Sequence, residues 1–176
     1  MRENEAKKFA ESEYKKLGKL GCEWNLLHAK CMIRAFEEIS RKKASEKIKA
    51  LAWVHDIGKI KSKENHARFS IEIIKRKFCL DSADEDCILN HGSAGKPKTR
   101  TGKIFRLADG ISIFHPVALF FRFYAQAKEG YNFVEIQNKI KDMYKKYLKS
   151  YADFPKAVKL LKRKYAALMG GLSSCN

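Results

Sequence analysis

Apolar residues recur at steps of three and four along most of the chain, which is the spacing of amphipathic helices. This period predicts helices over residues 24–39, 45–57, 66–78, 82–91 and 104–115. A fold of many short strands would need frequent turn residues, and the chain has only 10 Gly and 3 Pro among its 176 residues. The pattern therefore predicts an all-α protein.

Residues 92–103 are the one long stretch that lacks this period, and they predict a loop. The last third of the chain predicts two or three Lys-rich amphipathic helices, broken near Gly130 and Pro155. No internal repeat or linker divides the chain, whose length is typical of one domain. We therefore expect a single all-α domain over residues 1–176, in which the helices of residues 116–176 pack on the preceding core.

Polar side chains interrupt the apolar stripe of each predicted core helix. They are His28, His55, His66, His91 and Asp109, with Asp56 beside His55. Burying one polar group without a partner costs about 1–3 kcal/mol, and burying a bare carboxylate costs more. One such histidine is most simply a hydrogen-bonded core residue, but the same exception on five helices is a pattern. Because the helices of a bundle face one interior, we expect these groups to converge on a mixed nitrogen and oxygen metal site.

The order and context of these residues resemble the HD superfamily of metal-dependent phosphohydrolases. The family pattern is a lone His, a His-Asp doublet and a later Asp. It is matched by His28, by His-Asp-Ile-Gly-Lys at residues 55–59, and by Asp109. The resemblance covers residues 22–115, about half of the chain. It implies an HD-type helical bundle with a metal site in its interior.

His66 and His91 are similar to two further positions of the two-metal branch of this superfamily. The ligand set that the resemblance implies is Asp56 as a bridge, His28, His55 and Asp109 on one ion, and His66 and His91 on the other. Several relatives have a His-His pair where this chain has Asn90-His91, so we expect no more than two ions. Imidazole and carboxylate ligands without thiolate favour divalent Fe, Mn, Ni, Co or Zn.

The resemblance also implies a reaction, the hydrolysis of a phosphate ester by a metal-activated water. Two ions acidify a shared water and neutralise the phosphoryl oxygens, and Asp56 is the carboxylate that would hold both ions. Lys59 lies three residues after Asp56, and its family counterpart contacts the phosphate or assists the leaving group. Asp56 and Lys59 are thus the expected catalytic residues, although a surface role is the alternative for Lys59 in so Lys-rich a chain.

Four other cations could form a rim that binds a longer phosphate chain. They are Arg68 in the third predicted helix and Lys96, Lys98 and Arg100 in the loop. Loop lysines are more commonly only solvated, and that alternative stays open for this set.

The charge of the chain bears on its partners. Lys and Arg number 37 against 20 Asp and Glu, a formal net charge of +17 that favours phosphorylated small molecules or nucleic acid. A solvated helix surface explains the charge equally well. We expect a phosphohydrolase acting on a nucleotide or another small phosphate ester. Two alternatives remain: a metal-dependent phosphodiesterase or nuclease on RNA or single-stranded DNA, and a catalytically inactive metal-binding module.

The five cysteines show no CxxC spacing, and the N-terminal residues lack the apolar segment of a signal peptide. The most apolar stretch, residues 110–121, is shorter than the roughly 20 residues that span a bilayer. We therefore expect a cytoplasmic protein with reduced thiols and no membrane partner.

Overall fold

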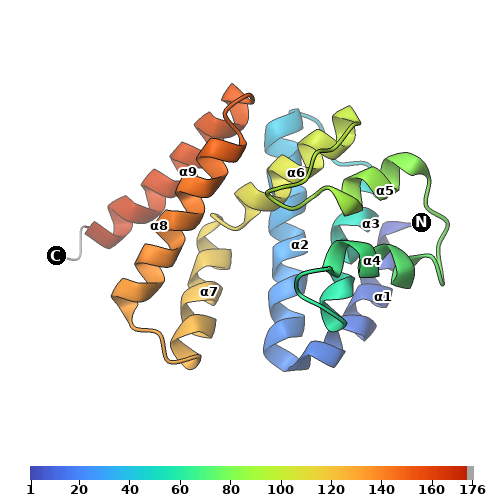
Figure 1. The fold of residues 1–176 in the computed structure, drawn as a ribbon, viewed down its shortest axis with the longest axis horizontal. Coiled ribbons are helices and arrows are strands. Elements are labelled where there is room, and N and C mark those ends of the chain that lie inside the picture. Colours follow the sequence, from blue (N-terminus) through green and yellow to red (C-terminus); the bar gives the residue numbers. More distant parts are fainter. Residues whose placement is uncertain (174–176) are drawn as a thin grey trace.

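The computed structural model describes residues 1–173 as helices joined by short connections (Figure 1). The N-terminal elements are α1 (Glu3–Tyr14), the 3₁₀ turn η1 (Lys15–Leu17), α2 (Gly18–Ser40) and α3 (Glu46–Val54). The middle elements are the 3₁₀ turn η2 (Ile57–Ile60), α4 (His66–Ile74), α5 (Ser82–Leu89) and α6 (Arg100–Ser112). The C-terminal elements are α7 (Pro116–Lys128), α8 (Phe133–Ser150) and α9 (Pro155–Ser173). No strand occurs among the described residues, so the predicted all-α class is confirmed.

Some helix boundaries differ from the sequence expectation for local reasons. The second predicted helix stops early, because the chain tightens after Val54 into η2. Helix α6 begins at Arg100 rather than near residue 104, since the Thr99 hydroxyl caps it by accepting from the Gly102 N–H at 2.9 Å. The expected cap of α3 is present, with Ser45 accepting from the Ile48 N–H at 3.3 Å.

Helix α1 has no counterpart in the sequence prediction, and it packs on α3. Ala6 and Ala10 are fully buried against the core, where their small side chains let the two helices approach closely. The Tyr14 hydroxyl donates to the Trp53 carbonyl at 3.2 Å, which ties the end of α1 to the end of α3. This contact fixes the segment that carries the His-Asp doublet.

Helix α2 is the longest element and lies at the centre of the molecule (Figure 1). Helices α1, α3, α4 and α5 lie on one side of it and α7, α8 and α9 on the other, while α6 packs along its length. Met32 and Ala35 on α2 are buried with Phe105 and Ala108 on α6. The interior between α2 and α6 is therefore the place where residues of both sides can meet.

The C-terminal helices enclose a group of rings that we call the aromatic cluster: Phe114, Tyr144, Tyr147 and Tyr165. The three tyrosine rings lie edge-on to Phe114 at centroid distances of 6.1, 6.2 and 6.3 Å. Such edge-to-face contacts add to the free energy gained by burying the rings. The cluster anchors α8 and α9 to the end of α6.

Two cysteines fill the core as small apolar side chains. Cys31 and Cys87 are buried and free, and burial raises the pKa of the Cys87 thiol to about 12. Cys22 and Cys79 are also free, while Cys175 lies outside the described residues.

Across the described chain, no helix taken alone combines the length and the apolar character needed to cross a membrane. Helices α6 and α7 meet those criteria only as a pair, and they are bent by 57° relative to each other.

Candidate metal centre

Six polar side chains from separate elements meet in the interior between α2 and α6. His28 comes from α2 and Asp109 from α6. The other four are His55 and Asp56 directly after α3, His66 at the start of α4, and His91 directly after α5. Five of them are buried, and His66 is partly exposed. The structure thus brings together the whole set expected from the sequence.

A glycine places the start of α4 against the His-Asp segment. A Cβ atom at Gly58 would lie 2.0 Å from the His66 carbonyl oxygen, so only glycine permits this approach. The Gly58 N–H donates to the hydroxyl of the buried Ser70 at 2.9 Å, which holds η2 to α4. His66 is therefore positioned across from Asp56 by a backbone contact.

Three of the histidines are oriented by backbone carbonyls. Each Nδ1–H donates to the carbonyl of the residue three positions earlier: His55 to Ala52 at 2.9 Å, His66 to Lys63 at 2.7 Å and His91 to Ile88 at 2.5 Å. A carbonyl oxygen can only accept, so Nδ1 carries the proton in each ring. The Nε2 lone pair of each ring is left to face the centre.

His28 is oriented by a hydroxyl. Ser112 donates its proton to the Asp109 carbonyl at 2.6 Å, so at its 3.0 Å contact with His28 it must accept from Nδ1–H. The His28 Nε2 lone pair then faces the Asp109 carboxylate oxygen Oδ1 at 2.9 Å. In the neutral ring, neither of these two atoms carries a proton.

Asp56 lies between two groups of nitrogen atoms. Its Oδ1 is 3.3 Å from His66 Nε2 and 3.4 Å from His91 Nε2. Its Oδ2 is 3.4 Å from His55 Nε2 and 3.8 Å from His28 Nε2. Asp109 lies on the second side, 3.6 Å from His55 Nε2. Each oxygen of the Asp56 carboxylate therefore faces a different group of ligand atoms.

These contacts leave lone pairs that no protein group satisfies. His66 Nε2 and His91 Nε2 are 2.9 Å apart although both rings donate through Nδ1, and His55 Nε2 is buried with no hydrogen-bond partner. Buried lone pairs facing one another cost free energy unless a proton or cation lies between them. The donor set is thus suited to divalent ions, and two sets of three residues each place their ligand atoms within 4.8 Å: His28, His55 and Asp109, and His55, Asp56 and His91.

The electrostatics of the site keep its ligands in the form that binds metal. Burial raises the pKa of Asp56, but its interactions with the neighbouring His55 ring and Lys59 ammonium outweigh burial and hold that pKa well below the usual value. Burial likewise opposes ionisation of Asp109, but the neighbouring His28 and His55 outweigh burial and hold the pKa of Asp109 well below its usual value. Burial lowers the pKa of His66, which favours the neutral ring. Carboxylates and neutral imidazoles are the forms that coordinate metals.

Lys59 lies at the site, as expected. It belongs to η2, and its ammonium group donates a hydrogen bond to Asp56 Oδ2. Its side chain is 27% exposed, so it stands between the buried carboxylate and solvent.

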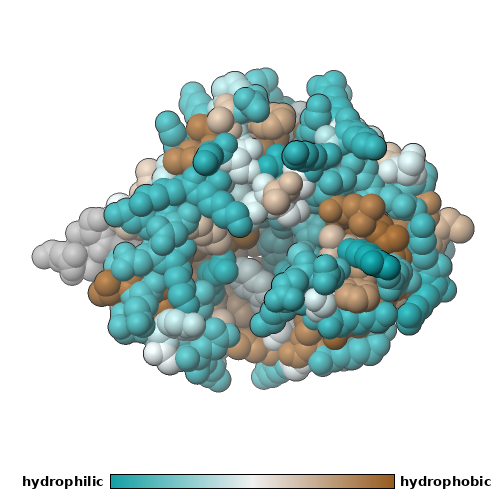
Figure 2. Space-filling model, viewed as in Figure 1, coloured by the Kyte–Doolittle hydropathy of each residue, from teal (hydrophilic) through white to brown (hydrophobic). Residues whose placement is uncertain are grey.

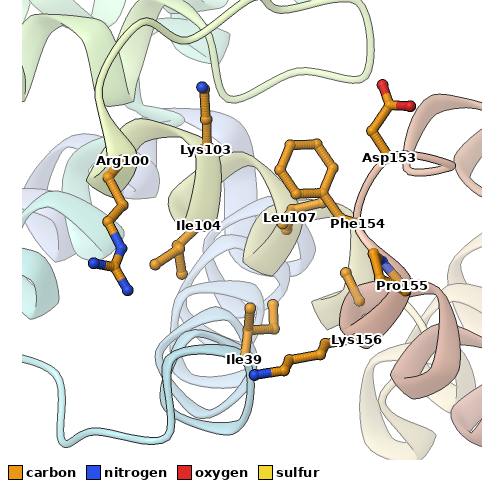
Figure 3. Close-up of a pocket in the computed structure, with 10 residues that line it drawn as sticks. Ile39, Arg100, Lys103, Ile104, Leu107, Asp153, Phe154, Pro155 and Lys156 are labelled. Atoms are coloured by element: carbon orange, nitrogen blue, oxygen red, sulfur yellow. The ribbon is translucent and has the colours of Figure 1, made fainter.

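The four cations of the expected rim have other surroundings in the structure. Arg68 is exposed and pairs with Glu72 at 3.4 Å, while Lys96 and Lys98 are exposed on a loop whose N–H groups bond to Asn90 and Asp86. Arg100 lines a different cavity of about 350 Å³ beside Ile104 and Phe154 (Figure 3). Among the described residues, none of the four forms a hydrogen bond or ion pair with the six.

Two residues of the site have no role in the sequence analysis. Ser112 orients His28, and its spacing of three residues after Asp109 is the signal that could have suggested it. Trp24 stacks on His28 with centroids 5.9 Å apart and planes at 11°. It lies one helical turn before His28, so its position on the same face of α2 was visible in the pattern.

A comparison with family models gives one match. The model described as HD domain matches residues 18–113, which is more than half of the chain and contains all six residues. The chain belongs to the HD-domain family. Comparisons of this HD-domain protein with curated proteins and with solved structures found no match. HD domains are metal-dependent hydrolases, although some are inactive, and the His and Asp groups here form a possible metal site.

Proposed function

We propose that this HD-domain protein is a phosphohydrolase that uses two divalent transition-metal ions to hydrolyse a nucleotide or another small phosphate ester. The observation that carries the proposal is the Asp56 carboxylate, whose two oxygens face two groups of imidazole nitrogens. A carboxylate between two such groups is the bridging ligand of two-metal hydrolytic sites. The alternative of one ion leaves His66 and His91 with opposed lone pairs and no partner.

Each side chain of the centre has a definite task. One ion would be held by His28, His55 and Asp109, the other by His66 and His91, and both by Asp56. When bound, the ions supply the positive charge that acidifies water and neutralises a phosphoryl group. The Nδ1–H bonds of the histidines keep their rings oriented without any metal, so the ligands are preorganised.

Lys59 would provide charge on the solvent side. Its ammonium donates to Asp56 Oδ2, one side of the carboxylate, and is partly exposed. A lysine has three donors on a flexible stem, so Lys59 can contact a substrate oxygen by rotating away from the carboxylate. It would then stabilise the charge that develops on the phosphoryl group or the leaving group.

The surroundings of His28 favour a substrate with an aromatic ring. Trp24, stacked on His28, lies 5.8 Å from the ring of Phe121 on α7. Tyr124 follows at 6.5 Å from Phe121 and is 48% exposed. The rings thus form a series of contacts from the buried His28 to the partly exposed Tyr124. Aromatic side chains of this kind can stack on nucleobases. A nucleotide whose phosphate reaches the centre would have its base beside them.

The test is a turnover screen with the purified protein. Mononucleotides, cyclic dinucleotides, dinucleoside polyphosphates and short RNA would be incubated with Mn²⁺, Fe²⁺, Ni²⁺, Co²⁺, Zn²⁺ or Mg²⁺, and the products separated by chromatography. We expect hydrolysis of a small nucleotide with a transition metal. Asp56→Asn keeps the side-chain volume but removes the charge, and should abolish both turnover and metal binding. Asp142→Asn, the same change at an exposed residue, is the matched control.

Three outcomes would contradict the proposal. Cleavage of RNA alone, with binding that weakens steeply as salt rises, would support the nuclease alternative. Bound metal without turnover of any compound would support the inactive module. Full activity of Asp56→Asn would exclude this centre as the place of reaction.

A further inference from the structure

Arg122 on α7 is a partly buried arginine without an anionic partner. Among the described residues, its one hydrogen bond runs from Nη1 to the Met143 sulfur at 3.1 Å, and it pairs with no carboxylate. Burial lowers the pKa of its guanidinium below the usual value. A thioether is a weak acceptor, so the remaining N–H donors of Arg122 lack acceptors in the protein.

Arg106, by comparison, is an arginine whose contacts explain a structural role. Arg106 on α6 donates to the carbonyls of Gly92 and Ser93 at 3.3 and 2.8 Å and to Ser150, and its guanidinium lies over the Tyr151 ring. It thereby ties the loop after α5 to the end of α8. Arg122 makes none of these contacts. The charge of Glu129 acts on it without forming an ion pair, and a partly buried charge that no carboxylate contacts is costly. If the side chain at position 122 only filled space between α7 and α8, an apolar residue would stabilise the fold more.

Two other polar groups beside Arg122 also lack partners. Gln126 lies one turn further on the same face of α7, and its Oε1 is buried with no hydrogen-bond partner. Within the described chain, the hydroxyl of the buried Tyr147 forms no hydrogen bond either. Polar groups of this kind, from α7 and α8 together, are what a binding site for a polar ligand presents.

Tyr147 connects these groups with the helix that carries Asp109. Tyr147 packs directly on the residue after Asp109, because a Cβ atom at Gly110 would be 2.3 Å from the tyrosine ring. Burial raises the pKa of Tyr147, the charge of Asp109 raises it further, and the charge of Arg122 opposes this. The tyrosine hydroxyl therefore lies within the electrostatic reach of both the centre and Arg122. In the view of Figure 2 the surface of the molecule is hollowed near the middle, between α7 and the core helices.

We propose that Arg122 binds an anionic phosphoryl oxygen of the substrate, with Tyr147 as a second donor. This inference rests on the proposed function. It assigns a specificity role to α7 and α8, which follow the matched HD region of residues 18–113. The rings of Phe121 and Tyr124 lie on the same helix as Arg122, so α7 would hold both the base and a phosphate of one nucleotide. A planar guanidinium is suited to phosphate because it can donate two parallel hydrogen bonds.

Binding of inorganic phosphate and of AMP, measured by calorimetry in EDTA, tests the proposal without turnover. We expect the wild-type protein to bind both, Arg122→Met to lose at least tenfold in affinity, and Arg122→Lys to lose less. Arg76→Met, the same change at an exposed residue, should bind as the wild type. With a hydrolysed substrate and metal present, Arg122→Lys should raise KM more than it lowers kcat, and Tyr147→Phe should do so to a smaller degree.

The possible failures are distinguishable. Unchanged phosphate and AMP binding in both Arg122 variants, with unchanged KM, would overturn the role of Arg122 while leaving the proposed hydrolase intact. Anion binding that depends on Arg122 in a protein that hydrolyses nothing would instead refute the proposed function. If Arg122→Met does not fold, Arg122→Lys and Tyr147→Phe decide the question.

Discussion

The molecule has two interiors of opposite character, the metal centre between α2 and α6 and the aromatic cluster between α6, α8 and α9. The first buries His28, His55, Asp56, His91 and Asp109 with lone pairs facing one another. The second buries Phe114 and Tyr147 edge to face. Polar burial of the first kind opposes folding until a cation is present, whereas ring burial of the second kind stabilises the fold. The comparison teaches that comparable burial can serve chemistry in one place and stability in another.

We expect the largest effect, on bound metal and on activity, from the double change His66→Ala with His91→Ala in the metal centre. It removes the two imidazoles that face Asp56 Oδ1 and leaves those that face Oδ2. Bound metal should fall from about two equivalents to about one. Activity should fall by several orders of magnitude, because the substrate loses half of the positive charge at the site, while helicity by circular dichroism should be retained.

The control for that change is His115→Ala, since His115 lies outside the cluster at the start of α7. Elemental analysis should show the wild-type metal content in this variant. An identical metal content in the double variant would mean that His66 and His91 hold no ion.

Phe114→Ala should have the opposite signature. Deleting this fully buried ring leaves a cavity among three tyrosines, so the free energy of unfolding should fall by about 3–5 kcal/mol. Metal content should be unchanged. Urea denaturation measures the first quantity and elemental analysis the second, and Phe120→Ala, at a ring that is 78% exposed, should change stability by less than about 0.5 kcal/mol. Loss of metal in Phe114→Ala would show that the two interiors are not independent.

Chelation should destabilise the protein through the metal centre alone. An ion that binds only the folded state adds about 2.7 kcal/mol at a free concentration one hundred times its Kd. Thermal unfolding with and without EDTA should show this increment in the wild type and in Phe114→Ala. It should be smaller in the double histidine variant. A Tm that does not respond to metal in the wild type would contradict the expectation that the opposed lone pairs accept a cation.

The smallest expected effect is a pH dependence of stability at His115, which belongs to neither interior. Burial, followed by the charges of Lys164 and Arg34, lowers the pKa of this ring, and its Nδ1 is buried without a hydrogen-bond partner. The folded protein therefore favours the neutral ring, so its stability should be unaffected at pH 8 and decline as pH falls below the unfolded-state pKa of about 6.5. His115→Gln should show a weaker decline in urea denaturation from pH 8 to 5, and parallel profiles would exclude this ring as a cause.

The sequence by itself determined the helical class and the set of polar residues at the centre. Helices can be predicted locally because their apolar face repeats every three or four residues. An imidazole on that apolar face is an exception to the pattern, and it can be recognised without knowing what the helix packs against. His28, His55, His66, His91 and Asp109 were therefore visible before any contact was known. Lys59 was located by its place after the His-Asp doublet.

Only the tertiary structure decided how those groups face one another. Ser112 orients His28 across 84 residues of sequence, and Gly58 admits the start of α4 through a backbone contact that no spacing encodes. The cavity that Arg100 lines and the contact of Arg122 with the Met143 thioether depend on the directions of helices that pack at long range. Local periodicity predicts which side of a helix is buried, whereas the partner it meets is set by the packing of the whole chain.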